Sequence, residues 1–138
     1  MTPPPLESRP LVLAIVAMLD AGLPNTIGIF WGMAPQGATP PYAVLYPDGG
    51  MESPADRSLA DDVPTDLRFQ ITAVGATPEQ AALVADKTAL ILLTAVPSVP
   101  GRRVRPIRQE GTQPVQRDDT AGELFFATAQ YLARSDRA

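Results

Sequence analysis

The stretch ITAVGATPEQAALVAD, residues 71–86, decides the fold, because it joins the end of one strand to the start of a helix. Apolar and polar residues alternate from Asp66 to Val74, which predicts a half-buried strand. Thr77 follows as the N-cap of a helix, Pro78 occupies its first position, and Gln80 completes a capping box. These residues predict a strand that feeds directly into a helix.

The predicted helix has two faces of different character when its residues are placed at 100° intervals. The side chains on the face that we expect against a sheet are small or apolar: Ala81, Ala85, Thr88 and Leu92. Leu83 and Leu90 lie seven residues apart on another side, among Glu79, Asp86 and Lys87. They are either scattered surface residues or part of a contact with a neighbouring subunit, and we favour the subunit contact.

An earlier helix is predicted from Ser8, a suitable N-cap, to about Ala21, with Gly22 ending it. Residues 11–19 are apolar on all sides, so a single sheet face cannot cover them. This run is also far shorter than the roughly 20 residues of a membrane span, and no membrane is expected among the partners. Residues 1–7 are rich in proline and predict a flexible N-terminal arm.

Two further strands are predicted at residues 27–31 and 42–46, where β-branched and aromatic side chains gather. We expect these two strands to pair antiparallel. Residues 47–64 contain glycines, prolines and acids but few apolar residues, which predicts a long acidic loop or a hairpin arm.

After the second helix, residues 103–109 and 124–133 predict two more strands, joined through a turn near Gly111 and the stretch 114–119. Pro106 places the first of them at a sheet edge or a bulge. The length of 138 residues suits one domain, 1–138. The order of elements predicts an α+β two-layer sandwich, with two main helices packed on one face of a four- to five-stranded, mostly antiparallel sheet.

The composition limits the chemistry open to this chain. Cysteine and histidine are both absent, which removes the serine and histidine triad, the cysteine nucleophile and most zinc sites. Two pairs of adjacent carboxylates, at 61–62 and 118–119, have no third acid spaced to join them in holding magnesium. We therefore expect no catalytic residues, no metal site, no cofactor and no enzymatic activity.

The net charge of -4 hides a separation of acids from arginines. Six acids lie between residues 48 and 66: Asp48, Glu52, Asp56, Asp61, Asp62 and Asp66. Five arginines lie in a later segment: Arg102, Arg103, Arg105, Arg108 and Arg117. Opposite poles on one small domain favour head-to-tail or ring association, although two solvated loops of unlike charge would give the same pattern.

The arginine segment could contact DNA phosphates or acids of a neighbouring subunit. In an extended strand, Arg103 and Arg105 share one face. No aromatic residue is interleaved there for base stacking, and arginine is favoured at protein interfaces. We therefore favour ion pairs with a neighbouring subunit.

Several segments carry a resemblance to a known family: GMAPQG at 32–37, PYAVLYP at 41–47, VGATPEQA at 74–81, PGRR at 100–103 and RDD at 117–119. They resemble the tail terminator proteins of tailed bacteriophages, particularly those of actinobacterial siphophages and the lambda-type terminator ring. The resemblance implies a virion protein, assembled in the host cytoplasm, that forms a homo-hexameric ring at the head-proximal end of the tail. Such a ring stops polymerisation of the tail tube protein and docks to the head-tail connector or neck protein.

The implied role suggests two sets of site residues as hypotheses. A subunit or ring interface would comprise Leu83, Leu90, Arg102, Arg103, Arg105, Arg108 and Arg117. A loop lining the lumen would carry Asp48, Glu52, Asp56, Asp61 and Asp62, so that genome DNA passes without specific binding because like charges repel. The alternatives are another head-tail connector or neck ring protein and a small nucleic-acid-binding adaptor.

Overall fold

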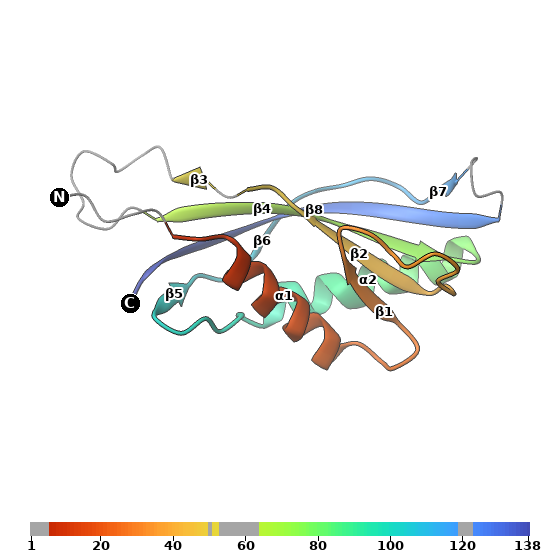
Figure 1. The fold of residues 1–138 in the computed structure, drawn as a ribbon. Helices are drawn as coiled ribbons and strands as arrows, with labels where there is room; N and C mark the ends of the chain where they lie inside the picture. Colours follow the sequence, from red (N-terminus) through yellow and green to blue (C-terminus); the bar gives the residue numbers. More distant parts are fainter. Residues whose placement is uncertain (1–5, 50, 53–63, 119–122) are drawn as a thin grey trace.

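The computed structural model describes residues 6–49, 51–52, 64–118 and 123–138 (Figure 1). Two helices and eight strands follow one another in these residues: α1 (Arg9–Gly22), β1 (Gly28–Trp31), β2 (Tyr42–Pro47), β3 (Met51–Glu52), β4 (Thr65–Gly75), α2 (Pro78–Thr94), β5 (Arg102–Val104), β6 (Arg108–Thr112), β7 (Gln116–Asp118) and β8 (Leu124–Arg137).

The eight strands form one sheet that is five strand positions wide. β4 and β8 are its long central strands, and they pair antiparallel from Thr65 opposite Ser135 to Gly75 opposite Phe125. β2 and β3 follow each other along the outer edge of β4, and β1 lies beyond β2. β5, β6 and β7 follow one another along the opposite edge of β8. Counted across the width of the sheet, the predicted four to five strands are confirmed.

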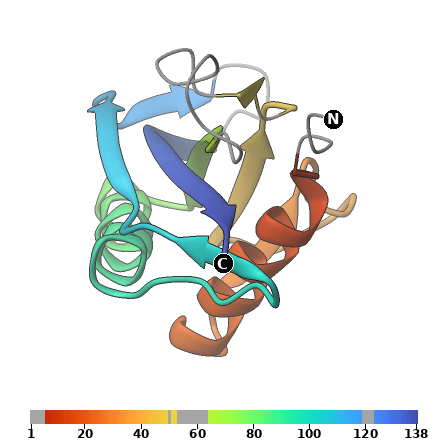
Figure 2. The ribbon, with the colours of Figure 1, turned by 90° about the vertical axis from the view of Figure 1, so that its left-hand side faces the viewer.

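Both helices lie on the same side of the sheet, which makes the fold an α+β two-layer sandwich (Figures 1 and 2). The core contains Leu11, Ile15 and Leu19 of α1 and Val84 and Leu92 of α2. The strand residues that meet them alternate along the chain: Ala43 and Leu45 of β2, Leu67, Phe69, Ile71 and Ala73 of β4, and Tyr131 and Ala133 of β8. The predicted alternation of residues 66–74 is therefore confirmed.

The junction of β4 and α2 forms as its sequence predicts. The amide of Gln80 donates to the Thr77 side-chain oxygen at 3.1 Å, and the Gln80 side chain accepts from the amide of Ala76 at 2.7 Å. Such caps satisfy amides that lack partners within the helix. Gly75 lets the end of β4 lie close to the first turn of α2. A Cβ on residue 75 would lie only 2.4 Å from the Ala81 nitrogen.

The direction of β1 differs from the prediction. β1 and β2 pair parallel, with Gly28 opposite Tyr42 and Trp31 opposite Leu45. A parallel pair needs a connection long enough to return to the start of the first strand. Residues 32–41 provide it, because β1 is only four residues long and Gly32 and Gly37 adopt positive φ angles in the connection.

The predicted strand at residues 103–109 is two strands in the structure. β5 ends at Val104 and β6 begins at Arg108, so Pro106 lies in the break between them. Proline cannot donate to a sheet ladder, which accounts for the interruption. The turn expected near Gly111 was also wrong, since Gly111 lies within β6 opposite Gln130, beside a bulge at Glu110.

Of the predicted loop or hairpin arm at 47–64, residues 50 and 53–63 lie outside the described residues, and β3 agrees with a hairpin arm. β3 pairs with the beginning of β4, with Met51 opposite Asp66 and Glu52 opposite Thr65. Helix α1 shows the predicted excess of apolar surface, because Leu13 is 47% exposed while its neighbours Leu11 and Val12 are buried. Ser8 occupies the N-cap position of α1, but its side chain makes no capping hydrogen bond.

Candidate interaction surfaces

One face of α2 presents two leucines and two acids to solvent. Leu83 and Leu90 are 48% and 65% exposed, so the structure places both predicted leucines at the surface. Glu79 and Asp86 are exposed on the same side of the helix. We use the name "outer face of α2" for Glu79, Leu83, Asp86 and Leu90. Leu93 and Val96, which the sequence prediction did not include, extend the exposed apolar surface beyond Leu90.

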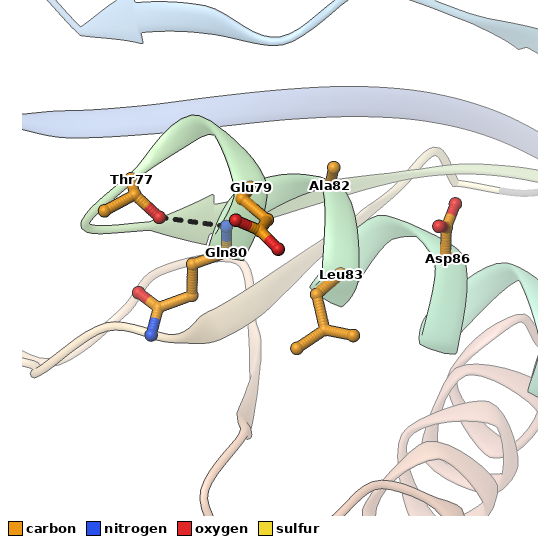
Figure 3. Close-up of a pocket in the computed structure, with 6 residues that line it drawn as sticks. All are labelled: Thr77, Glu79, Gln80, Ala82, Leu83 and Asp86. Atoms are coloured by element: carbon orange, nitrogen blue, oxygen red, sulfur yellow. Dashed lines mark hydrogen bonds between the residues drawn. The ribbon is translucent and has the colours of Figure 1, made fainter.

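An open hollow of about 490 Å³ adjoins the N-terminal part of this face (Figure 3). Its lining residues come from the helix cap and the first three turns: Thr77, Glu79, Gln80, Ala82, Leu83 and Asp86. The hollow thus combines two carboxylates with apolar groups. This chemistry suits a cationic side chain whose aliphatic part can rest against leucine.

The structure separates the predicted arginines along β8. Arg102 and Arg103 lie in β5, opposite the C-terminal end of β8, and Arg105 follows directly. Arg108 is opposite Leu132, and Arg117 in β7 is opposite Phe125, near the other end of β8. The five arginines therefore do not form one patch, because the chain from β5 to β7 runs along the whole length of β8.

Arg102, Arg103 and Arg105 contact other groups of the same chain. The Arg102 guanidinium donates to the carbonyl oxygen of Glu7, and burial lowers the pKa of Arg102. Arg103 and Arg105 both approach the Asp136 carboxylate, at 3.3 and 3.8 Å. This agrees with the prediction that Arg103 and Arg105 share a face. Both side chains nevertheless remain 68% and 53% exposed.

Of the acids predicted to line a lumen, the structure describes Asp48 and the backbone of Glu52. Asp48 accepts from the amide of Arg68 at 3.3 Å, and Glu52 lies in β3. Asp56, Asp61 and Asp62 lie outside the described residues. Asp48 therefore lies beside β4, on the edge where β2 continues toward β3.

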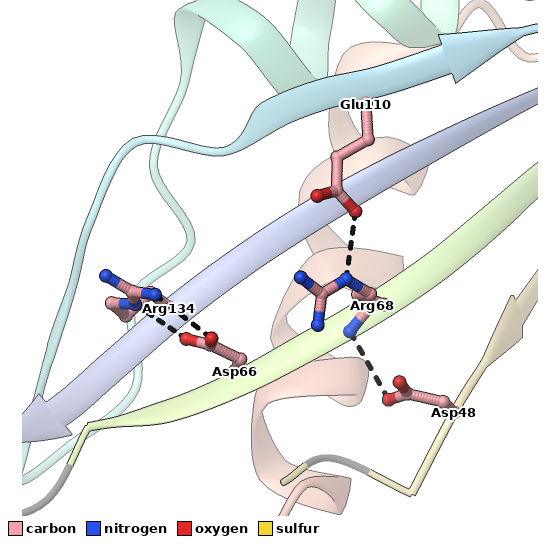
Figure 4. Close-up of polar contacts among 5 residues, drawn as sticks. All are labelled: Asp48, Asp66, Arg68, Glu110 and Arg134. Carbon is pink, nitrogen blue, oxygen red and sulfur yellow. Dashed lines mark hydrogen bonds and ion pairs between the residues drawn. The ribbon is translucent and has the colours of Figure 1, made fainter. Parts of the chain in front are cut away.

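The sheet face opposite the helices carries two ion pairs that the sequence prediction missed (Figure 4). Arg134 donates to both oxygens of Asp66, at 2.6 and 3.0 Å. Arg68 pairs with Glu110 at 3.1 Å. The hydrogen bonds from Arg134 lower the pKa of the Asp66 carboxyl, against the opposing effect of burial. Alternation places Asp66 and Arg68 of β4 on one face, but only the register of β4 and β8 brings Asp66 opposite Arg134.

Aromatic residues occupy the other end of the same sheet face. Tyr42 and Tyr46 line an open hollow of about 350 Å³ together with Thr72, Phe126 and Asp118. Phe30 meets Tyr42 edge to face, with ring centroids 5.8 Å apart. Burial raises the pKa of the Tyr42 hydroxyl, and the negative charge of Asp118 adds a smaller effect in the same direction.

Neither α1 nor α2 is long and apolar enough to cross a membrane. Within the described part of the chain, no three carboxylates come together in a group that could hold a metal ion.

The two-layer sandwich has a counterpart among solved structures. A chain of the virion of a native gene transfer agent particle has the same fold, with a TM-score of 0.63 and 14% sequence identity. The match covers 88% of this chain and 84% of that chain. No family model and no curated protein matches the sequence.

Proposed function

We propose that this protein is a structural subunit of a bacteriophage virion. The observation that carries the proposal is the shared fold with a virion chain of a gene transfer agent particle, which extends over most of both chains. The sequence resemblance to tail terminators points in the same direction. The exposed leucines of α2 suit a subunit that buries them in an assembly.

Within the virion, we propose the role of tail terminator. Six copies would form a ring at the head-proximal end of the tail tube, with one face of the ring docking to the tube protein. The opposite face would meet the connector or neck protein. Polymerisation would stop because that opposite face lacks the surface on which the next ring of tube protein assembles.

A lumen that carries negative charge would let genome DNA pass without binding, because its charge has the same sign as the phosphates. We propose that Asp48 and the acids of the following segment supply this charge. Asp48 supports the proposal in one respect, since its side chain is at the surface beside Arg68.

The nucleic-acid-binding adaptor is less well supported. A phosphate-binding surface needs several cations close together to displace counterions. The arginines here are spread along β8, and Arg102, Arg103 and Arg105 already contact groups of their own chain. A neck ring remains the second candidate, because it would use the same kind of lateral contact.

The test begins with the mass of the purified protein by light scattering after size exclusion. The protein is then added to tail tube protein while tubes are growing, and tube length is measured by electron microscopy. A terminator forms a hexamer, alone or on the tube end, and shortens tubes in proportion to its concentration. A protein that leaves tube length unchanged but binds the connector would be a neck ring, and a monomer that shifts DNA in a salt-dependent way would be the adaptor.

A further inference from the structure

We infer that the outer face of α2 on one copy binds the arginine edge of the next copy. The arginine edge is defined here as Arg103, Val104 and Arg105. This inference rests on the proposed ring, and it specifies which two surfaces form the contact between neighbouring subunits.

The arginine edge lies at one end of the subunit, and the outer face of α2 begins at the other end, with Glu79 and Leu83 in the N-terminal part of the helix. β5 pairs with the C-terminal end of β8, where Arg103 is opposite Asp136. α2 begins three residues after Gly75, which is opposite Phe125 at the other end of β8. Figure 1 shows β5 and the first turn of α2 at opposite ends of the sheet. Eleven residues of strand separate these positions, or roughly 36 Å at about 3.3 Å per residue.

This separation determines the kind of contact that can form. Two different surfaces that do not overlap can both be occupied at once, so each copy can bind one neighbour at each end. Repetition of such a head-to-tail contact gives a closed ring when its rotation closes. A ring subunit requires this arrangement.

The chemistry of the two surfaces is complementary. Glu79 and Asp86 provide two exposed carboxylates, while Leu83 provides apolar surface in the same hollow. Arg103 and Arg105 share a single carboxylate, that of Asp136, at 3.3 and 3.8 Å. Arg103 also donates to the carbonyl oxygen of Arg137 at 3.4 Å. Each guanidinium has five N–H donors, so these contacts still leave most of the donors available to a second partner. The aliphatic part of an arginine can pack against leucine while its guanidinium pairs with a carboxylate.

Charge also argues against the simplest alternative, in which two α2 helices pair about a twofold axis. That arrangement would bring Glu79 and Asp86 of one copy close to the same acids of the other, and like charges destabilise a contact. Lys87 is a single cation on this part of the helix and is half-buried. The arginine edge offers two exposed cations instead.

The absence of cysteine from the sequence allows a direct test. Two single variants, Leu83→Cys and Arg105→Cys, are purified separately, mixed and oxidised under mild conditions. A head-to-tail contact gives a disulfide-linked dimer in the mixture and no dimer with either variant alone. The double variant gives a ladder of linked species up to the full ring. Ala17→Cys, at an exposed position of α1, is the control that should not link to Arg105→Cys.

A second measurement keeps the inference testable if the cysteines disturb packing. Asp86→Arg reverses one charge of the outer face of α2 and should weaken association by at least about tenfold. Asp20→Arg makes the same change at an exposed position of α1 and should leave association unchanged. Circular dichroism melting of both variants checks that the fold is retained.

Each outcome separates this contact from the proposed terminator role. A dimer formed by Leu83→Cys alone would overturn the inference in favour of twofold pairing of α2. A ring that shortens tubes but gives no link in the mixture would overturn this contact and leave the terminator role intact. A ladder in a protein that does not affect tube length would support the contact and remove the terminator role.

Discussion

The pair of Asp66 and Arg134 provides the sharpest prediction about stability. We expect Arg134→Met to lower the free energy of unfolding by about 2–3 kcal/mol at pH 7. Methionine keeps much of the length of the side chain but leaves the Asp66 carboxylate without its bidentate partner. Breaking a fully buried ion pair costs about 3–5 kcal/mol, whereas exposed pairs contribute about 0–1 kcal/mol. The side chain of Asp66 is 5% exposed and that of Arg134 is 37% exposed, so this pair lies between the two limits.

The pH dependence of this loss has a definite sign. The pKa of Asp66 in the folded protein lies below its ordinary value of 3.8, mainly because Arg134 binds the ionised form. The stabilisation is therefore fully present above the pKa of the unfolded chain and is lost as the pH falls through the folded pKa. The difference between the wild type and Arg134→Met should be largest near pH 7 and should shrink below about pH 4.

Urea unfolding at pH 7 and at pH 3 measures both effects, at one fixed protein concentration because association adds to apparent stability. Arg68→Met is the matched control, since its pair with Glu110 is on the same sheet face but more exposed. We expect it to cost less than about 1 kcal/mol. The reasoning is refuted if Arg134→Met and Arg68→Met lose equal stability at pH 7, or if the loss for Arg134→Met is the same at pH 3.

Two further substitutions probe packing. Gly75→Ala should lower the free energy of unfolding in urea by about 3 kcal/mol. The new Cβ would lie 2.4 Å from the Ala81 nitrogen and 2.8 Å from the Gln80 carbonyl carbon, both of them backbone atoms. An unchanged unfolding midpoint would contradict this reasoning. Ser135→Ala should raise the free energy of unfolding by about 1 kcal/mol, because the buried Ser135 hydroxyl has no hydrogen-bond partner among the described residues. A decrease in stability would show that this hydroxyl has a partner.

The features that could be predicted from the sequence are those formed by residues close together in the chain. The cap of α2 depends on Thr77 and Gln80, three residues apart, and the alternation of β4 is visible in adjacent residues. Exposure of Leu83 and Leu90 followed from helical periodicity in the same way. Whether either leucine contacts another subunit depends on a second molecule, and it stays a prediction.

The features that could not be predicted depend on how distant segments pair. The direction of β1 is set by the path of residues 32–41, which strand propensity does not describe. The arginines are close in sequence, but pairing with β8 separates them, and Pro106 interrupts their strand. Asp66 and Arg134 are 68 residues apart, and their pairing follows from the register of β4 and β8.

The central place of β8 also affects the order in which the protein can fold. β4, β5, β6 and β7 all pair with β8, yet all four precede it in the chain. During synthesis, β4 has its partner β2 on one edge but must wait about sixty residues for the partner on its other edge. Contacts of such long sequence separation form slowly, and an unpaired strand edge can pair with other chains. A nascent subunit therefore depends on β8 both to complete its sheet and to end its period of greatest risk of aggregation.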